Sequence, residues 1–242
     1  MDLNIIIENC GKRDSDVTIR EKINRCRELG FHTIALSVVV DIRGKNFKIP
    51  SAPNVETLGK YGLKIYTRLT AKTEQTLELF KLNKDKEASK YDLIALEPCN
   101  DKILQYIAGD NAQLDILTFD LSEKADYRLV KTHYEGLVRK GICIEINYGP
   151  AQLGSTLRRN IICAGQKLVE KCNKMMILSS GIDDTFRLRG PKDAECLGYL
   201  LMLPKNKCHD AVYKNGLSAI DQAKRRKNPS SSAIELVNVD ED

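Results

Sequence analysis

The sequence predicts an α/β fold of the TIM-like barrel type, with about seven parallel strands. Seven short apolar runs are nearly all continuous rather than alternating, as strands buried on both faces require. Amphipathic helical patterns separate them, and repeated strand–helix units give parallel strands with right-handed connections. With 242 residues, of which 42% are hydrophobic and 29% charged, the chain is long enough for one large core.

The expected strands share a high content of branched apolar residues. They are Leu3 to Ile7, Thr33 to Val40, Leu63 to Leu69, Asp92 to Leu96, Ile116 to Phe119, Ile142 to Tyr148 and Met175 to Ser180. The expected helices carry apolar residues at helical spacing. They are Val17 to Leu29, Thr76 to Lys90, Asn100 to Ile107, His133 to Lys140, Ser155 to Lys174, a helix that begins at Gly190-Pro191, and a short one near His209 to Asn215.

The helix from Ser155 has the clearest pattern, with Ser155 as the expected N-cap and one apolar stripe that includes Leu157, Ile161 and Leu168. An open doubly wound sheet is the alternative to a barrel, and periodicity does not separate the two. No G-x-G-x-x-G follows the first strand, which disfavours the dinucleotide-binding version of that sheet.

We expect a barrel domain over residues 1–222 and a flexible C-terminal tail over 223–242, because the composition changes near Ala223 to "AKRRKNPSSSAIELVNVDED". The "KRRK" at 224–227 is a weak motif for nuclear import or RNA clamping, and a solubilising tail is an equal interpretation. No stretch has the length and hydrophobicity of a membrane span or secretory signal. The eight cysteines form no C-x-x-C pair and indicate buried thiols in a reducing compartment.

Little in the sequence points to catalysis. The three histidines are far apart, none in an H-x-H or H-E-x-x-H pair, so we expect no metal site and no cofactor. No G-x-S-x-G marks a nucleophile. Five carboxylates lie in or just after expected strands, where they could do acid–base work or pair with arginines: Glu97, Asp120, Glu145, Asp183 and Asp184.

Cations at two expected helix starts are more informative. Arg158 and Arg159 lie in the first turn of one helix, where the helix dipole disfavours positive charge unless an anion is near. Arg187, Arg189 and Lys192 flank the start of the next helix in "SSGIDDTFRLRGPKD" (179–193). Adjacent loops of a barrel lie on one face, so these five cations could converge on phosphate.

A sixth cation, Arg68 near the end of the third expected strand, could join them from across the barrel mouth. The alternative is that the arginines pair internally with Asp183, Asp184 and Glu145 as a structural network. The formal net charge of +5 suits a polyanionic partner without requiring one.

Several of these segments resemble the thirty-kilodalton protein subunit shared by nuclear ribonuclease P and ribonuclease MRP. The similar blocks are "SSGIDDTFRLRGPKDAECLGYLLML", "INYGPAQLGSTLRRNIICAGQKLV", "IYTRLTAK" and "YDLIALEP". The family's S-T-x-R-R element corresponds to Ser155, Arg158 and Arg159, and its R-G-P-x-D element to Arg189, Gly190, Pro191 and Asp193. Arg68 corresponds to the arginine of T-R-L-T.

The resemblance implies a barrel related to the polymerase and histidinol phosphatase (PHP) fold, in a nuclear and nucleolar protein without catalytic residues of its own. It implies that the chain supports a catalytic RNA in precursor tRNA 5′ processing and ribosomal RNA maturation. The implied partners are the ribonuclease P or MRP RNA, other protein subunits including a small heterodimer partner, and precursor tRNA through the complex, with no membrane. A stand-alone barrel phosphoesterase or phosphosugar enzyme is the alternative.

Overall fold

The computed structural model describes residues 1–242 except 45–46, 56–57, 59–61, 110–112, 123–129 and 229–242. In the described part an eight-stranded sheet has the order β2-β1-β3-β4-β5-β6-β7-β8. All neighbours pair in parallel except β2, which is antiparallel to β1. The strands are β1 (Asp2–Asn9), β2 (Lys12–Arg13), β3 (Thr33–Asp41), β4 (Lys64–Thr73), β5 (Leu93–Pro98), β6 (Ile116–Phe119), β7 (Cys143–Asn147) and β8 (Met176–Ser179).

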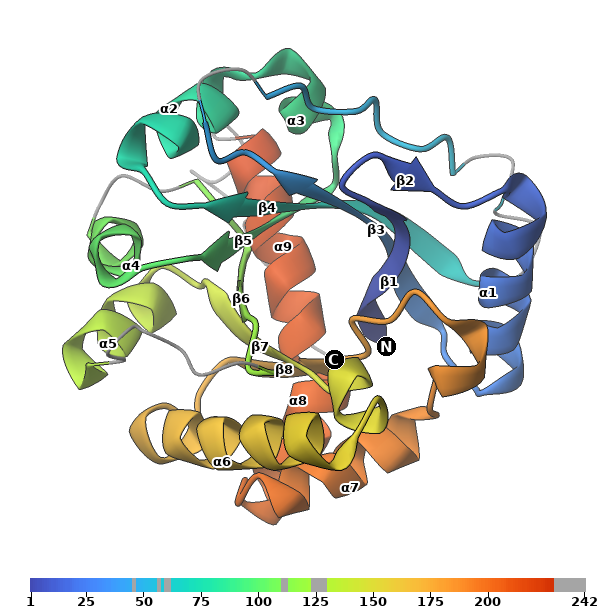
Figure 1. Ribbon diagram of the computed structural model, residues 1–242. Helices are drawn as coiled ribbons and strands as arrows, with labels where there is room; N and C mark the ends of the chain where they lie inside the picture. Colours follow the sequence, from blue (N-terminus) through green and yellow to red (C-terminus); the bar gives the residue numbers. More distant parts are fainter. Residues whose placement is uncertain (45–46, 56–57, 59–61, 110–112, 123–129, 229–242) are drawn as a thin grey trace, which may run out of the picture.

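The sheet curls so that the chain after β8 meets β1 (Figure 1). The backbone N–H of Ile6 donates to the carbonyl of Ile182 at 3.0 Å, and the N–H of Gly181 donates to the carbonyl of Asn4 at 3.1 Å. The prediction of a barrel with about seven parallel strands is therefore confirmed, and the open sheet is excluded. Among the strands of the described residues, the two-residue β2 is the one that was not expected.

Helices surround the sheet (Figure 1). They are α1 (Asp16–Glu28), α2 (Thr76–Lys84), α3 (Lys86–Lys90), α4 (Asp101–Ala108), α5 (Lys131–Arg139), α6 (Ser155–Lys171), α7 (Pro191–Leu200), α8 (Lys205–Tyr213) and α9 (Asn215–Lys227), with 3-10 turns η2 (Gly149–Gln152) and η3 (Thr185–Arg187). The single helix expected over residues 76–90 is two helices, because Asp85 is extended and its carboxylate accepts from the N–H groups of Glu87 and Ala88.

The start of α6 differs from the expectation by one residue. Gly154 is the N-cap, in an extended conformation, and no side chain caps the helix. Ser155 is already helical, so its hydroxyl does not have the N-cap role that the sequence suggested.

Helix α9 closes the amino-terminal end of the barrel (Figure 1). Ala219, Ile220 and Ala223 are buried there in a cluster with strand residues from inside the barrel, which are Leu3, Ala35, Leu93, Ala95, Ile116, Cys143 and Ile177. Since α9 runs to Lys227, the tail expected from residue 223 does not begin there. Residues 229–242 of that tail lie outside the described residues.

Two residues of the basic segment at the end of α9 pair with carboxylates that lie just before β5 and β6. Arg226 lies 2.9 Å from Asp115, which is fully buried, and Lys227 lies 2.8 Å from Asp92. Lys224 pairs with Asp221 at 3.2 Å. The pair of Lys224 and Asp221 lies within α9, whereas Arg226 and Lys227 hold α9 on the barrel, a role that the motif "KRRK" did not suggest.

Candidate nucleic-acid interface

The cations at the starts of α6 and α7 meet at one cleft. Because β7 and β8 are neighbours in the sheet, the loops that follow them lie side by side. Arg158 of α6 and Arg189, just before α7, both line a cleft of about 460 Å³ together with Tyr148, Gln152 and Asp193. The structure thus brings together one arginine from each helix start, as expected for the adjacent loops of a barrel.

Backbone contacts position these two arginines. The Nε of Arg158 donates to the carbonyl of Ala151 at 3.1 Å, and an Nη of Arg189 donates to the carbonyl of Phe186 at 3.2 Å. The Tyr148 hydroxyl lies 3.2 Å from the carbonyl and 3.3 Å from the N–H of Arg189. A guanidinium has five N–H donors, so donors remain for an anion after these contacts.

The other cations of this surface also reach solvent, at least in part. Lys192 has 85% of its side chain exposed and lies 4.0 Å from Glu195. Arg159 is exposed and has no ion pair among the described residues. Arg187 pairs with Asp184 at 3.1 Å, but both side chains are partly exposed, and such pairs contribute roughly 0–1 kcal/mol. A phosphate could therefore replace Asp184 at little cost.

The prediction that Arg68 reaches the barrel mouth is wrong. Arg68 is fully buried inside the barrel, and its guanidinium forms a two-pronged pair with Glu145 at 2.6 and 2.7 Å. It also donates to the carbonyl of Leu3 and the hydroxyl of Thr70. Since all these partners lie inside the sheet, Arg68 is a core residue, and the internal pairing that the sequence left open applies to it.

Burial also shapes the titration of Glu145. Desolvation raises the pKa of this carboxyl, but the charge and hydrogen bonds of Arg68, with smaller contributions from Ser179 and Thr118, hold the pKa below its ordinary value. Glu145 is thus ionised and fully engaged. That arrangement suits a structural ion pair and leaves it no proton to exchange with a substrate.

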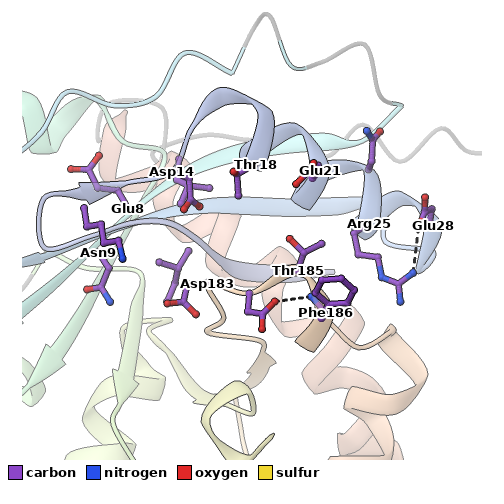
Figure 2. Close-up of a pocket in the computed structure, with 15 residues that line it drawn as sticks. Glu8, Asn9, Asp14, Thr18, Glu21, Arg25, Glu28, Asp183, Thr185 and Phe186 are labelled. Carbon is purple, nitrogen blue, oxygen red and sulfur yellow. Dashed lines mark hydrogen bonds and ion pairs between the residues drawn. The ribbon is translucent and has the colours of Figure 1, made fainter. Parts of the chain in front are cut away.

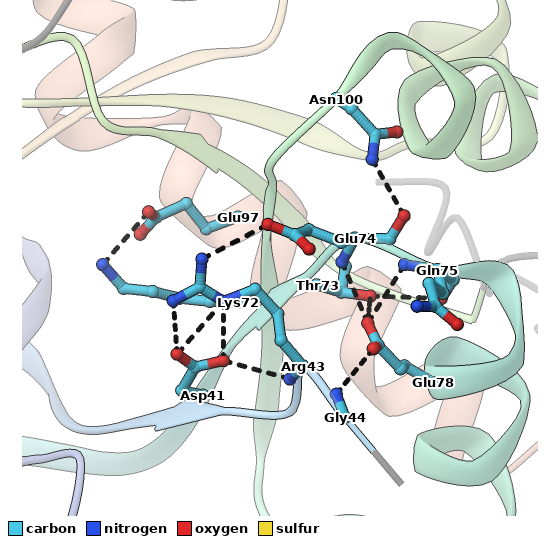
Figure 3. Close-up of polar contacts among 10 residues, drawn as sticks. All are labelled: Asp41, Arg43, Gly44, Lys72, Thr73, Glu74, Gln75, Glu78, Glu97 and Asn100. Carbon is cyan, nitrogen blue, oxygen red and sulfur yellow. Dashed lines mark hydrogen bonds and ion pairs between the residues drawn. The ribbon is translucent and has the colours of Figure 1, made fainter.

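The carboxyl ends of β3, β4 and β5 carry a network of paired charges (Figure 3). Arg43 donates to both oxygens of Asp41 and lies 3.3 Å from Glu74. Lys72 lies 3.2 Å from Glu97. Burial raises the pKa of Glu97, and the charge of Lys72 opposes that shift.

The carboxylates suggested for acid–base work are thus mostly occupied at the barrel mouth. Besides Glu97, Asp120 accepts from the N–H and hydroxyl of Ser122. In the part of the chain that the structure describes, no group of three or more His, Cys, Asp or Glu side chains could hold a metal ion. The pairing of Lys72 with Glu97 was not predicted, because the sequence gives no register between β4 and β5.

These observations define an α/β barrel protein in which Arg68 and Glu145 pair inside the barrel and exposed cations gather at two neighbouring helix starts, those of α6 and α7. The family described as RNase P subunit p30 matches residues 1–228 of the chain. The chain belongs to this family, and the resemblance found in the sequence is confirmed. No described helix is long and apolar enough to cross a membrane.

Relatives from several eukaryotes share about a quarter to a third of their residues with this chain. Ribonuclease P protein subunit p30 of Mus musculus is 27% identical over 220 residues, 86% of this chain and 82% of that protein. Probable ribonuclease P protein subunit 3 of Schizosaccharomyces pombe is 26% identical over 238 residues, 97% of each. Protein GAMETOPHYTE DEFECTIVE 1 of Arabidopsis thaliana is 31% identical over 173 residues, 71% of this chain but only 30% of that protein.

Two solved structures share the fold. One is a chain of an archaeal ribonuclease P with mature tRNA, with a TM-score of 0.63, 17% identity, and coverage of 98% of this chain and 100% of that one. The other is histidinol phosphate phosphatase from Lactococcus lactis, with a TM-score of 0.51, 12% identity and coverage of 92% of each chain. At these identities the likeness concerns the barrel alone.

Proposed function

We propose that the chain is a non-catalytic RNA-binding subunit of ribonuclease P and ribonuclease MRP, which supports the catalytic RNA in precursor tRNA 5′ processing and ribosomal RNA maturation. The observation that carries the proposal is the convergence of Arg158 and Arg189 on one cleft, in a chain of the p30 family. The relatives named as ribonuclease P subunits, and the archaeal ribonuclease P chain of the same fold, support it.

The physical role would be electrostatic. One guanidinium group can donate two parallel hydrogen bonds to the oxygens of one phosphate. Its positive charge also lowers the repulsion between RNA strands that approach each other. In this proposal Arg158 and Arg189 contact phosphate inside the cleft, with Arg159, Arg187 and Lys192 at its edge. Ser155, exposed at the start of α6, could add a hydroxyl donor. No metal or cofactor is needed for this task.

The proposal includes the assembly and its place in the cell. The partners would be the ribonuclease P or MRP RNA, the other protein subunits with a small heterodimer partner among them, and precursor tRNA through the complex. The location would be the nucleus and nucleolus, and the barrel would be of the PHP type.

The test is the salt dependence of binding to the RNA of the holoenzyme from the same source. Arg158→Ala with Arg159→Ala should weaken binding and reduce the slope of log K against log salt by about 2, since each lost phosphate contact removes about one unit. Lys86→Ala with Lys102→Ala is the matched control: it removes the same charge from exposed residues of α3 and α4.

An unchanged slope for the arginine variant, with circular dichroism showing an intact fold, would assign Arg158 and Arg159 to structure. An equal loss in the control variant would mean that net charge alone drives binding and that the cleft has no special part in it.

A further inference from the structure

A second groove lies between α1 and the loop that follows β8, and the phosphate proposal does not use it (Figure 2). It has a volume of about 880 Å³ and is lined by β1, by α1 and by residues 183–186. Ile6 and Ile7 form part of its floor, and Phe186 stands at its edge. We call it the Phe186 groove.

Phe186 is 88% exposed, a higher fraction than that of any other large hydrophobic residue in the described part of the chain. Its backbone is nevertheless held. The carboxylate of Asp184 accepts from its N–H at 3.0 Å, and Arg189 donates to its carbonyl. The amide of Gln152 donates to the next carbonyl, that of Arg187, at 2.8 Å. An aromatic ring on a fixed turn loses little entropy when a partner covers it, and such rings dominate protein interfaces.

The charge of the groove is opposite to that of the whole chain. Six carboxylates line it, from Glu8, Asp14, Glu21, Glu28, Asp183 and Asp184, together with two cations, Lys12 and Arg25. Four of the six are paired, Glu8 with Arg13, Asp14 with Lys22, Glu28 with Arg25 and Asp184 with Arg187, so the unpaired negative charge is that of Glu21 and Asp183. The chain as a whole carries +5. Among the described residues neither Glu21 nor Asp183 has an ion-pair partner, and both are exposed. Such a surface repels RNA phosphates and attracts cationic side chains.

We propose that the Phe186 groove docks a Lys- and Arg-rich segment of another protein subunit, with an apolar side chain of that segment against Phe186. Residues 183–186 line this groove and Arg189, further along the same loop, lines the cleft proposed to bind phosphate, so one loop would contribute to both a protein face and an RNA face. The proposed function supplies the assembly in which this partner occurs; the geometry and charge of the groove supply its chemistry.

The first experiment places the photo-crosslinking residue p-benzoylphenylalanine at position 186 in the full chain, within the purified ribonucleoprotein. We expect a crosslink to a protein segment rich in Lys and Arg, mapped by mass spectrometry. The same residue at position 80 is the control, because Phe80 is also exposed, at 50%, but lies on α2. A crosslink to RNA from position 186, or none to protein, would overturn the proposal.

The second experiment measures fluorescence anisotropy with a twelve-residue peptide of alternating Lys and Leu. Phe186→Ala should weaken its binding at least tenfold, and so should Glu21→Lys with Asp183→Lys. The control pair Glu135→Lys with Glu170→Lys makes the same change in net charge at exposed residues of α5 and α6. We expect it to bind the peptide more tightly than these variants do. A second peptide, of alternating Glu and Leu, is the control for peptide charge. Its affinity for every variant should be no higher than the affinity of the wild type for the Lys peptide.

Equal affinity of wild type and Phe186→Ala for the Lys peptide would show that the Phe186 ring does not contribute to binding. If both charge-reversal pairs weaken peptide binding equally, the groove is not the binding site. These outcomes are separate from a failure of RNA binding, because the Arg158 and Arg159 variant leaves every residue that lines the groove unchanged.

Discussion

Replacement of Arg68 by methionine tests the assignment of this residue to the core. The change removes four hydrogen bonds, two to Glu145 and one each to Leu3 and Thr70, at a position with no exposed surface. It leaves Glu145 buried with its charge uncompensated. Loss of one partner of a buried pair costs about 3–5 kcal/mol, and we expect that decrease in the free energy of unfolding.

Urea unfolding followed by far-ultraviolet circular dichroism measures the loss, since the chain has no Trp for a fluorescence signal. A decrease of this size is a large part of the 5–15 kcal/mol of a typical domain, so the single variant could be mostly unfolded in water. Arg68→Met with Glu145→Leu keeps the experiment interpretable. Because it removes both charges, the double variant should recover much of the stability, which gives a coupling of several kcal/mol between the two sites.

A cost below about 1 kcal/mol for Arg68→Met, with weaker RNA binding, would refute the reasoning, because the arginine would then contact phosphate. The pH dependence adds a second check. The pKa of Glu145 is lowered on folding, so its contribution to stability is complete above its ordinary value of 4.5 and is lost as the pH falls through the folded value. The stability difference between wild type and Glu145→Gln should therefore shrink below pH 4.5.

Two further predictions concern α9 and catalysis. Arg226→Ala leaves Asp115 buried without its cation, and a loss of about 3 kcal/mol should lower Tm by roughly 6–12 °C in a thermal melt, whereas Arg225→Ala, an exposed neighbour, should change it little. RNA-free protein should not hydrolyse bis-p-nitrophenyl phosphate with added Mn²⁺ or Zn²⁺. Hydrolysis that Asp183→Asn or Glu145→Gln abolishes would instead favour the phosphoesterase alternative.

The arrangement of strands and helices was predictable because burial on both faces of a parallel strand leaves a continuous apolar run in the sequence. Each of the seven expected runs overlaps a parallel strand. Helix α9 was missed because its buried face uses small residues, Ala219 and Ala223 with Ile220, which pack against strand residues of the barrel. Such a face has little hydrophobicity, so no helix was expected over residues 216–222 and the composition suggested a tail from residue 223.

The candidate site was predictable in part. Arg158 and Arg189 stand at the starts of helices that follow neighbouring strands, and chain order alone brings such positions together in a barrel. Arg68 was assigned wrongly because whether an arginine near a strand end faces solvent or the interior depends on a partner 77 residues away, Glu145. Phe186 lies within the charged segment "SSGIDDTFRLRGPKD", but a single aromatic there gives no sign of its exposure.

The two sets of charges differ in what binding would cost. Inside the barrel, Arg68 and Glu145 have lost their water and hold each other at 2.6 Å, so neither can leave the other without a large penalty. At the helix starts, Arg187 and Asp184 remain partly hydrated at 3.1 Å, and exchange of the carboxylate for a phosphate is nearly neutral. A barrel that keeps Arg68 paired with Glu145 in its interior and the cations at its helix starts weakly paired is suited to hold RNA in a fixed geometry. For the same reason, mutation of the interior pair should alter stability first, and mutation of the surface cations should alter RNA affinity first.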